Sequence, residues 1–568
     1  MNKTKPKVEL YISLMIFLVT FFVVYLQFSP IFFGLNDDGT MVALINGTYV
    51  DNASKSQIYT SEIYARIMSS LYQYFPVFQW HGIYLFLTVL VSLLVLIRCT
   101  VENDNRNFLI TTGIFLVILN LYIIFIISPI FTTAALISGF SALIVFYKNL
   151  IYGKRQILLP AVLLFNSFMI RPDGFLAVIY FLVPGIIYLI YLIYKGDKSV
   201  GWNLLIILPT VIIYTFELFE KMLLRSSSKE WDNYWQFLNS IHLIHTNPSM
   251  LKMHQAIASF QIPGLKWTNV EATLLHSMAY LDPEIFSGSQ MELAKNHVRD
   301  YLGIRALFNY EFIPTIQRIW EYNSFVKYIL FALVAILAIY TLFSRRQIYL
   351  IYVSFIFYIF FFYYYLAAAW RIPPRINLPI LLMIVIGILI LNSYSKIYSF
   401  KLNLIAIYTS LAFILVAQFQ ITGFKGAAEK LLQRQIEVQI ISDELRRVDR
   451  NGIFIGEIAY SNESYTNAFI NRIDYKTLDL ATGWQVFSPP WLGKVRDLGN
   501  GDGNPIPLLV DKENVYWVSD EYIGEVMAMY LNDRKLIAKG LCDLGKLPNG
   551  GVIFSFQLTN KECDYRKD

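Results

Sequence analysis

The chain has 568 residues, of which 56% are hydrophobic and only 15% are charged, whereas soluble domains carry about a quarter charged residues. This composition excludes a single soluble globular domain, a disordered chain, a collagen-like repeat and a coiled coil. The net charge of +6 is spread over many short loops, which argues against a nucleic-acid partner. The sequence predicts a mostly α, polytopic protein embedded in a lipid bilayer.

Long apolar runs recur along most of the chain. A bilayer core of about 30 Å needs about 20 apolar residues per helix, so runs of this length predict about eleven spans. The run at 157–170 is the shortest, and a tilted or broken helix is expected there. The predicted spans lie at about 9–30, 77–97, 108–127, 130–147, 157–170, 175–194, 202–219, 326–343, 348–369, 376–393 and 402–421.

Lys and Arg fall in every second connection between these spans, and such an asymmetry sets the orientation of a membrane protein. The pattern places the amino terminus in the cytoplasm and, with an odd number of spans, the carboxyl terminus on the far side. No cleavable signal peptide is expected, because the basic start leads into a span that is too long. The basic residues are Lys3, Lys5, Lys7, Arg98, Arg106, Lys148, Lys154, Arg155, Lys195, Lys198, Arg345, Arg346, Lys396 and Lys401.

The first outer loop, 31–76, begins with Asp37 and Asp38, directly after the first span. Asp favours helix N-caps and turns, so one interpretation of the pair is purely local structure. An amphipathic helix lying flat on the membrane is predicted for the next stretch, Ile58 to Phe75. Its apolar face is predicted to contain Tyr59, Ile63, Ile67, Met68, Leu71, Tyr72 and Phe75.

Three arginines, Arg171, Arg371 and Arg375, lie at predicted outer ends of spans, where basic residues are normally scarce. The guanidinium group pairs well with phosphate, which suggests a phosphate site. The alternative is structural: Arg171 pairs with Asp173, and the other two extend towards lipid headgroups. The sequence leaves both interpretations open.

The second outer loop, 220–325, contains Trp231, Tyr234 and Trp235, which can stack on sugar rings or anchor the chain at the membrane surface. His242 and His245 have an i, i+3 spacing, but this spacing fits no zinc signature. Loop packing is therefore the preferred interpretation of the histidines.

The region 422–568 is predicted to be an extracytoplasmic α+β domain, whereas 1–421 forms the membrane core with the outer loops 31–76 and 220–325. A loop with Trp484 and Pro489-Pro490-Trp491 is expected to face a glycan or the membrane. Cys542 and Cys563 lie on the oxidising side, where they can pair. The expected elements are an amphipathic helix at 424–448, strands at 453–455, 515–518 and 552–556, a helix near 523–531 and a turn at 500–504.

The chain contains no phosphate-binding loop of the G-x-G-x-x-G or Walker type in a strand–turn–helix context. The predicted cytoplasmic segments are only short connectors. Any chemistry is therefore expected outside the cytoplasm, where soluble nucleotides are scarce.

Several short pieces together resemble the C-type (GT-C) glycosyltransferases, and most of all the bacterial polytopic enzymes that decorate O-antigen, including serotype-converting glucosyltransferases. The likeness covers most of the chain. The pieces are Asn36-Asp37-Asp38, Leu71-Tyr72…Phe75-Pro76…Trp80, Phe131-Thr132-Thr133-Ala134-Ala135, Ile170-Arg171-Pro172, Trp231…Tyr234…Asn239 and Pro374-Arg375.

The resemblance implies transfer of a single sugar, such as glucose, from a polyprenyl-phosphate donor to a surface glycan acceptor, at the bacterial inner (cytoplasmic) membrane. Asp37 or Asp38 is then the expected base, because the attacking hydroxyl must lose a proton. Arg171, Arg371 and Arg375 are expected to bind the donor phosphate. Some relatives hold a divalent ion, so the two aspartates are also candidates for Mg²⁺ or Mn²⁺.

One acidic cluster without a second nucleophile favours single-step transfer with inversion. The aromatic residues Trp231, Tyr234, Trp235 and Trp484 are candidates for sugar or acceptor contacts. The alternatives are a polysaccharide polymerase or ligase that acts on lipid-linked glycans, a transporter or flippase, and a receptor or structural protein. Transporters need ionisable groups within the membrane, and the predicted spans are nearly free of them. The sequence implies no oligomeric state.

Overall fold

The computed structural model describes residues 37–47, 54, 56–101, 118, 121–122, 125, 129–153, 155–246, 265, 267–302, 376, 379–380, 382–384, 386–387, 390, 433, 436–437, 439–457, 478–536 and 541–557. The predicted spans at 9–30, 326–343, 348–369 and 402–421 lie outside this set, most of the span at 108–127 does, and half of the span at 376–393 does. Every structural statement below concerns the described residues.

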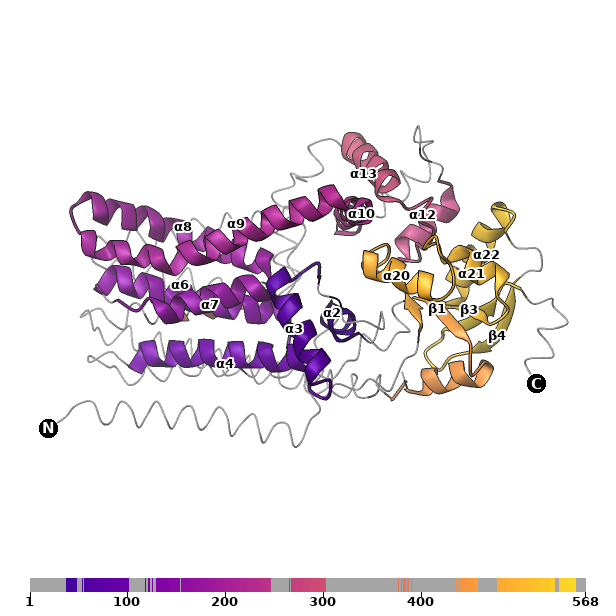
Figure 1. Ribbon diagram of the computed structural model, residues 1–568, viewed down its shortest axis with the longest axis horizontal. Coiled ribbons are helices and arrows are strands. Elements are labelled where there is room, and N and C mark those ends of the chain that lie inside the picture. Colours follow the sequence, from indigo (N-terminus) through magenta and orange to yellow (C-terminus); the bar gives the residue numbers. More distant parts are fainter. Residues whose placement is uncertain are drawn as a thin grey trace, which may run out of the picture.

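Helices dominate the described part of the chain, and four of them are long and apolar enough to cross a membrane. They are α4 (Trp80–Val101), α6 (Phe131–Tyr152), α8 (Pro172–Tyr194) and α9 (Leu204–Ser227). The predicted spans at 77–97, 130–147, 175–194 and 202–219 are thereby confirmed as apolar helices. Figure 1 shows them side by side in one bundle.

The bundle is built around α6, whose residues Phe131 to Leu150 are all buried. α7 (Leu158–Ile170) packs on α6 but has only 13 residues, about 20 Å of helix, which is too short for a bilayer core. The prediction of a short helix at 157–170 is therefore confirmed. By contrast, α8 and α9 expose many apolar side chains, as helices that face lipid do.

Two short helices, α2 (Asp37–Asn46) and α3 (Glu62–Tyr74), lie between the bundle and the C-terminal domain (Figure 1). α3 begins only at Glu62, because the Ser61 hydroxyl caps it by accepting a hydrogen bond from the Tyr64 amide. Its buried face contains Tyr64, Met68 and Tyr72, whereas Ile67 is exposed.

The predicted apolar face of the stretch 58–75 therefore matches the buried face of α3 only in part. It omitted Tyr64, and it included Ile67 and Phe75, both of which are exposed. The physical reason is that α3 packs against α4 and α7, so protein contacts select a face that hydrophobicity alone does not distinguish.

The described part of the second outer loop is also helical and shares a hydrophobic core with the C-terminal domain. It begins with α10 (Lys229–Thr246), which follows the end of α9, whereas η1 (Lys198–Asn203) lies before the start of α9 and outside this loop. α12 (Asn269–His276) and α13 (Gly288–Leu302) complete this group.

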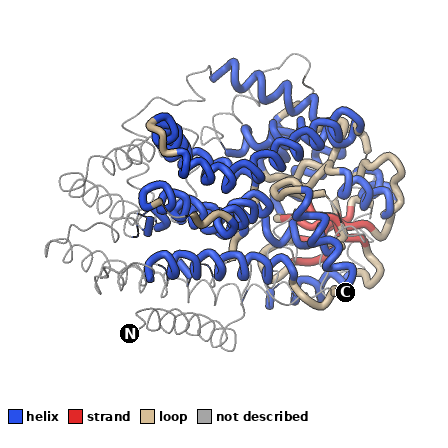
Figure 2. The backbone as a smooth tube through the Cα atoms, turned by 60° about the vertical axis from the view of Figure 1, so that its left-hand side comes forward, coloured by secondary structure: helices blue, strands red, loops and turns tan. Residues whose placement is uncertain are grey.

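The C-terminal domain is α+β, as predicted. Five strands in the described part of this domain form one mixed sheet in the order β2-β1-β3-β5-β4, which Figure 2 shows in red among the surrounding helices. β2, β1 and β3 are parallel, whereas β5 is antiparallel to both β3 and β4. The strands are β1 (Ile453–Gly456), β2 (Leu480–Ala481), β3 (Val515–Ser519), β4 (Cys542–Lys546) and β5 (Val552–Ser555).

The strands predicted at 453–455, 515–518 and 552–556 match β1, β3 and β5, and the helix predicted near 523–531 matches α22 (Glu521–Asp533). Residues 439–448 are helical, which agrees with the end of the helix predicted at 424–448. The turn at 500–504 is also present, with the Asp502 carboxylate accepting a hydrogen bond from the Asn504 amide.

The prediction of an aromatic loop through Pro489-Pro490-Trp491 was wrong. These residues begin helix α20 (Pro489–Asp497), and the Trp491 side chain is buried. Proline is well suited to the first turn of a helix, whose amide groups have no partner within the helix, and Ser488 supplies the cap. β2, β4 and the short helix α21 (Ile506–Asp511) had not been predicted either. Cys542 is disulfide-bonded, Cys99 is a buried thiol, and Cys563 lies outside the described residues.

Replacing Gly456 with alanine is expected to destabilise the sheet. A Cβ atom at this position would lie 2.2 Å from the Val518 carbonyl oxygen on the neighbouring strand, and such overpacking typically costs about 1–3 kcal/mol. Hydrogen–deuterium exchange of the β1 and β3 amides measures the loss. Gly493→Ala in α20 is the control, because nothing lies within 4 Å of its Cβ position, so equal protection of both variants would contradict the prediction.

Candidate active site between the helical bundle and the C-terminal domain

Asp38 lies in the first turn of α2 and is only 1% exposed. Its Oδ1 atom accepts hydrogen bonds from the Phe131 amide at 3.0 Å and from His81 Nε2 at 3.1 Å. Because Phe131 is the first residue of α6, the carboxylate lies at the positive end of that helix. The helix dipole and the amide group both stabilise a negative charge there.

His81 connects Asp38 to the surface helix α3. Its Nδ1 atom lies 2.7 Å from the Tyr64 hydroxyl. Burial raises the pKa of Tyr64 well above its ordinary value, and the nearby Tyr84, Tyr72 and Asp38 act in the same direction. The Tyr64 hydroxyl therefore keeps its proton. In the neutral ring, Nδ1 accepts from Tyr64 while Nε2–H donates to Asp38, which fixes the orientation of the carboxylate.

Further buried groups hold His81 in place. The His81 amide donates to the Tyr72 hydroxyl at 3.1 Å, and that hydroxyl bonds to the Gln79 side chain. The start of α4 is thus tied to α3 through side chains that are all buried. This network makes the position of Asp38 depend on how α3 is docked.

Arg171 lies at the sharp turn where α7 ends and α8 begins. Its Nη1 atom donates to the Thr132 hydroxyl at 2.5 Å, and the guanidinium lies 4.7 Å from the centre of the Phe131 ring. Nη2 is 3.9 Å from the exposed Asp173 carboxylate. The ion pair with Asp173, which the sequence offered as a purely structural role for Arg171, is therefore only one of several contacts, and its distance is long.

Trp484, which belongs to the C-terminal domain, extends into the same region. Its ring meets the Tyr59 ring edge to face at 4.9 Å, and Tyr59 in turn lies 5.7 Å from the Arg171 guanidinium. The buried Tyr234 hydroxyl donates to the Trp484 carbonyl at 3.0 Å. Trp484 also packs against both hydrophobic cores, so it marks the junction of the bundle and the C-terminal domain.

The first two residues of α6 therefore bind a carboxylate and a guanidinium group. Asp38 binds the Phe131 amide, and Arg171 binds the Thr132 side chain. Two of the sequence pieces that carry the family resemblance, at 131–135 and 170–172, take part in this arrangement, because Phe131 binds Asp38 and Thr132 binds Arg171. The arrangement offers a carboxylate that can accept a proton. At the adjacent residue of α6 it also offers a guanidinium that can stabilise an anion.

The other predicted site residues are distributed differently. Arg371 and Arg375 lie outside the described residues, as does the side chain of Asp37. Trp231 and Trp235 flank Tyr234 on α10 and pack against the second core. Trp235 also receives the guanidinium of Arg225 at 5.6 Å.

Among the described residues, no group of three or more His, Cys, Asp or Glu side chains could hold a metal ion. Among the described side chains of these types, His81 bonds to Asp38 Oδ1. These residues alone do not form a ligand set for Mg²⁺ or Mn²⁺, which require several oxygen ligands.

Sequence reasoning missed His81, Tyr64, Tyr59 and Thr132. His81 follows Trp80 at the start of a predicted span, where a polar ring costs free energy unless it has a partner. That position was the available signal. Tyr59 and Tyr64 gave none, because the pattern of the stretch 58–75 is equally consistent with aromatic side chains facing lipid.

No protein-family model matches the chain, and no curated protein matches its sequence. Among solved structures, the chain is similar to ArnT from Cupriavidus metallidurans in the apo state, with 11% sequence identity and a TM-score of 0.39 over 97% of this chain and 98% of that chain. A likeness this weak supports no assignment of function. The site is therefore interpreted from its own residues.

Proposed function

We propose that this protein is an inverting membrane glycosyltransferase of the GT-C type. It moves a single sugar, such as glucose, from a polyprenyl-phosphate donor to a surface glycan such as O-antigen, on the extracytoplasmic side of the bacterial inner membrane. The observation that carries the proposal is that Asp38 and Arg171 bind successive residues, Phe131 and Thr132, at the amino end of α6.

The position of this cluster along the bundle supports the proposal. Arg98, Lys148 and Lys195 lie near the opposite ends of their helices. Arg98 is 17 residues from His81 on α4, about 25 Å along the helix. If the basic end faces the cytoplasm, the cluster lies at the outer leaflet, where a lipid carrier presents its phosphate.

In the proposed step, the acceptor hydroxyl oxygen attacks the anomeric carbon and its proton passes to Asp38. The bond between the anomeric carbon and the phosphate oxygen breaks, and the electron pair leaves with the polyprenyl phosphate. Arg171 stabilises the charge that develops on this leaving group. Because Asp38 is nearly fully buried, the acceptor reaches it only when neighbouring side chains move.

Tyr59 and Trp484 are the proposed sugar-binding surface, because they lie next to Arg171 and present aromatic rings. Replacing Trp484 with alanine is expected to raise the KM for a substrate about tenfold, the effect of losing one or two aromatic contacts. Trp231→Ala is the matched control, since this tryptophan is also partly buried but lies on the second core. Equal KM values for the two variants would contradict this role.

The function is tested with membranes that contain the overexpressed chain, incubated with defined polyprenyl-phosphate sugars and candidate acceptors. Transfer of one sugar with inverted linkage is the expected result. Parallel reactions with a chelator, followed by Mg²⁺ or Mn²⁺, test whether a divalent ion takes part with Asp37 and Asp38. No transfer from any polyprenyl-phosphate donor, by protein that is folded and inserted, would refute the proposal.

A polysaccharide polymerase or ligase is the alternative, since it also acts outside the membrane on lipid-linked glycans. The two functions differ in the glycan that a deletion strain makes. Loss of side-branch sugars with normal chain length supports the transferase, whereas loss of the polymer supports the alternative.

A further inference from the structure

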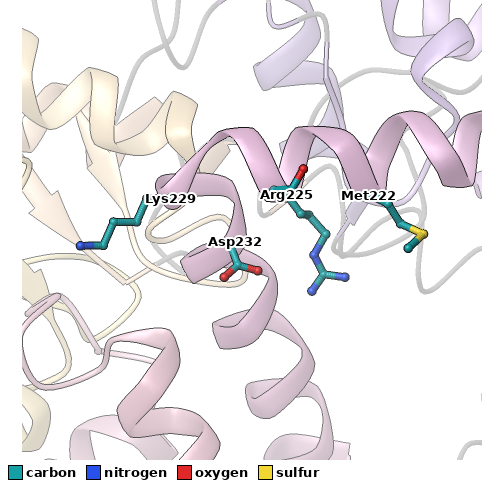
Figure 3. Close-up of a pocket in the computed structure, with 5 residues that line it drawn as sticks. Met222, Arg225, Lys229 and Asp232 are labelled. Atoms are coloured by element: carbon teal, nitrogen blue, oxygen red, sulfur yellow. The ribbon is translucent and has the colours of Figure 1, made fainter.

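An open pocket of about 630 Å³ lies where α9 gives way to α10, a volume typical of small-molecule sites. Met222, Arg225, Ser226, Lys229 and Asp232 line it. Figure 3 shows Asp232 between Arg225 and Lys229, below the bend of the two helices. The pocket therefore combines two cations with one carboxylate.

The carboxylates near the pocket form ion pairs with other basic residues and not with Arg225 or Lys229. Glu217 pairs with Lys221, Glu220 with Arg66, and Glu230 with Arg496. Arg225 instead stacks on the Trp235 ring. Within the described residues, neither Arg225 nor Lys229 has a carboxylate within 4 Å. The pocket thus keeps a net positive charge.

An exposed apolar stripe on α9 leads directly to this pocket. Leu208, Ile212, Phe216, Phe219 and Met222 follow one another at intervals of three or four residues, and all are exposed. This spacing places them on one face of the helix. The same spacing continues to Arg225 in the last turn of α9. Lys229 begins α10 after the break at Ser228 and lines the same pocket, so the stripe ends next to the two cations.

The pocket is separate from the proposed active site. Asp232 and Tyr234 are two residues apart on α10, about 200° around the helix, so they lie on opposite faces. Tyr234 is buried and bonds to Trp484, whereas Asp232 lines the pocket. A ligand of the pocket therefore does not occupy the space next to Arg171 and Trp484.

We propose that this pocket binds the phosphate headgroup of a bilayer phospholipid whose acyl chains lie along the exposed stripe of α9. The apolar stripe accounts for the chains, and Arg225 and Lys229 account for the phosphate, because guanidinium and ammonium groups bind phosphate strongly. The position at the end of a membrane-spanning helix places the headgroup at the depth of the lipid phosphates.

The test measures lipid retention by the full-length chain in neutral detergent, using native mass spectrometry with phosphatidylglycerol. Arg225→Ala and Lys229→Ala together are expected to weaken binding about 25-fold, or about fivefold for each cation near a phosphate layer. Asp232→Asn is expected to strengthen binding, because it removes a like charge. Arg447→Ala with Lys546→Ala is the control, since both residues are exposed on the C-terminal domain and the change in net charge is the same.

Two further probes separate the headgroup from the chains. Diacylglycerol with the same chains is expected to bind weakly and equally to the wild type and the double variant. Inorganic phosphate at millimolar concentration is expected not to displace the phospholipid. Unchanged phosphatidylglycerol binding by the double variant, equally tight diacylglycerol binding, or displacement by free phosphate would each overturn the proposal. Because none of these measurements needs sugar transfer, their outcome does not depend on the proposed function.

Discussion

Asp38→Asn is expected to abolish sugar transfer while leaving membrane insertion and folding intact. Asparagine keeps the shape of the side chain and an oxygen that can accept the Phe131 amide, but it cannot take a proton from the acceptor at neutral pH. Loss of a general base typically lowers the rate about 10²–10⁴-fold. Initial rates with saturating donor and acceptor measure the effect.

Two comparisons make this result specific to Asp38. Asp37→Asn tests the neighbouring carboxylate, which the sequence did not distinguish from Asp38, and a loss only at Asp38 would assign the base. Asp497→Asn, at the end of α20, controls for the loss of one negative charge. Wild-type activity of Asp38→Asn would remove the proposed base, and loss of activity together with loss of folding would be recognised by size-exclusion chromatography.

Arg171→Ala is expected to lower kcat about 10²–10³-fold, the usual effect of removing one group that stabilises charge in the transition state. Arg171→Lys is expected to restore little of this loss, because an ammonium group cannot bind Thr132 and a phosphate oxygen with one planar fork. Single-turnover rates with a polyprenyl-phosphate sugar measure the effect on the chemical step.

The control for Arg171 is Arg66→Ala on α3, because Arg66 is exposed and pairs with Glu220. The Arg66→Ala variant is expected to transfer sugar at the wild-type rate. A normal kcat for Arg171→Ala would show that this arginine does not meet the leaving group. A raised KM alone would indicate that Arg171 contributes equally to binding the donor and the transition state.

Much of the fold could be predicted, because helices that face lipid must be long and continuously apolar. The predicted ranges at 77–97, 130–147, 175–194 and 202–219 therefore correspond to α4, α6, α8 and α9. The strands β1, β3 and β5 were also recognisable as short runs of β-branched and aromatic residues. β2 has only two residues and β4 contains Gly545, so neither had a pattern to recognise.

The candidate site could be predicted only in part. Arg171 stood out because basic residues are scarce at the outer ends of spans, and Asp38 stood out because it follows the first span and belongs to a piece that carries the resemblance. Their proximity could not be predicted, since it depends on how α2, α6 and the turn between α7 and α8 pack together. His81 and Tyr64 act through hydrogen bonds between residues 17 positions apart, which no local pattern encodes.

Trp484 packs on both hydrophobic cores, and α2 contributes side chains to both as well. The two halves of the molecule are therefore not modules that can be exchanged between homologous chains or produced separately without loss. A chimera that joins this bundle to a foreign carboxyl-terminal domain would therefore have to keep three parts together. These are Trp484, Tyr234, which binds the Trp484 carbonyl, and helix α2.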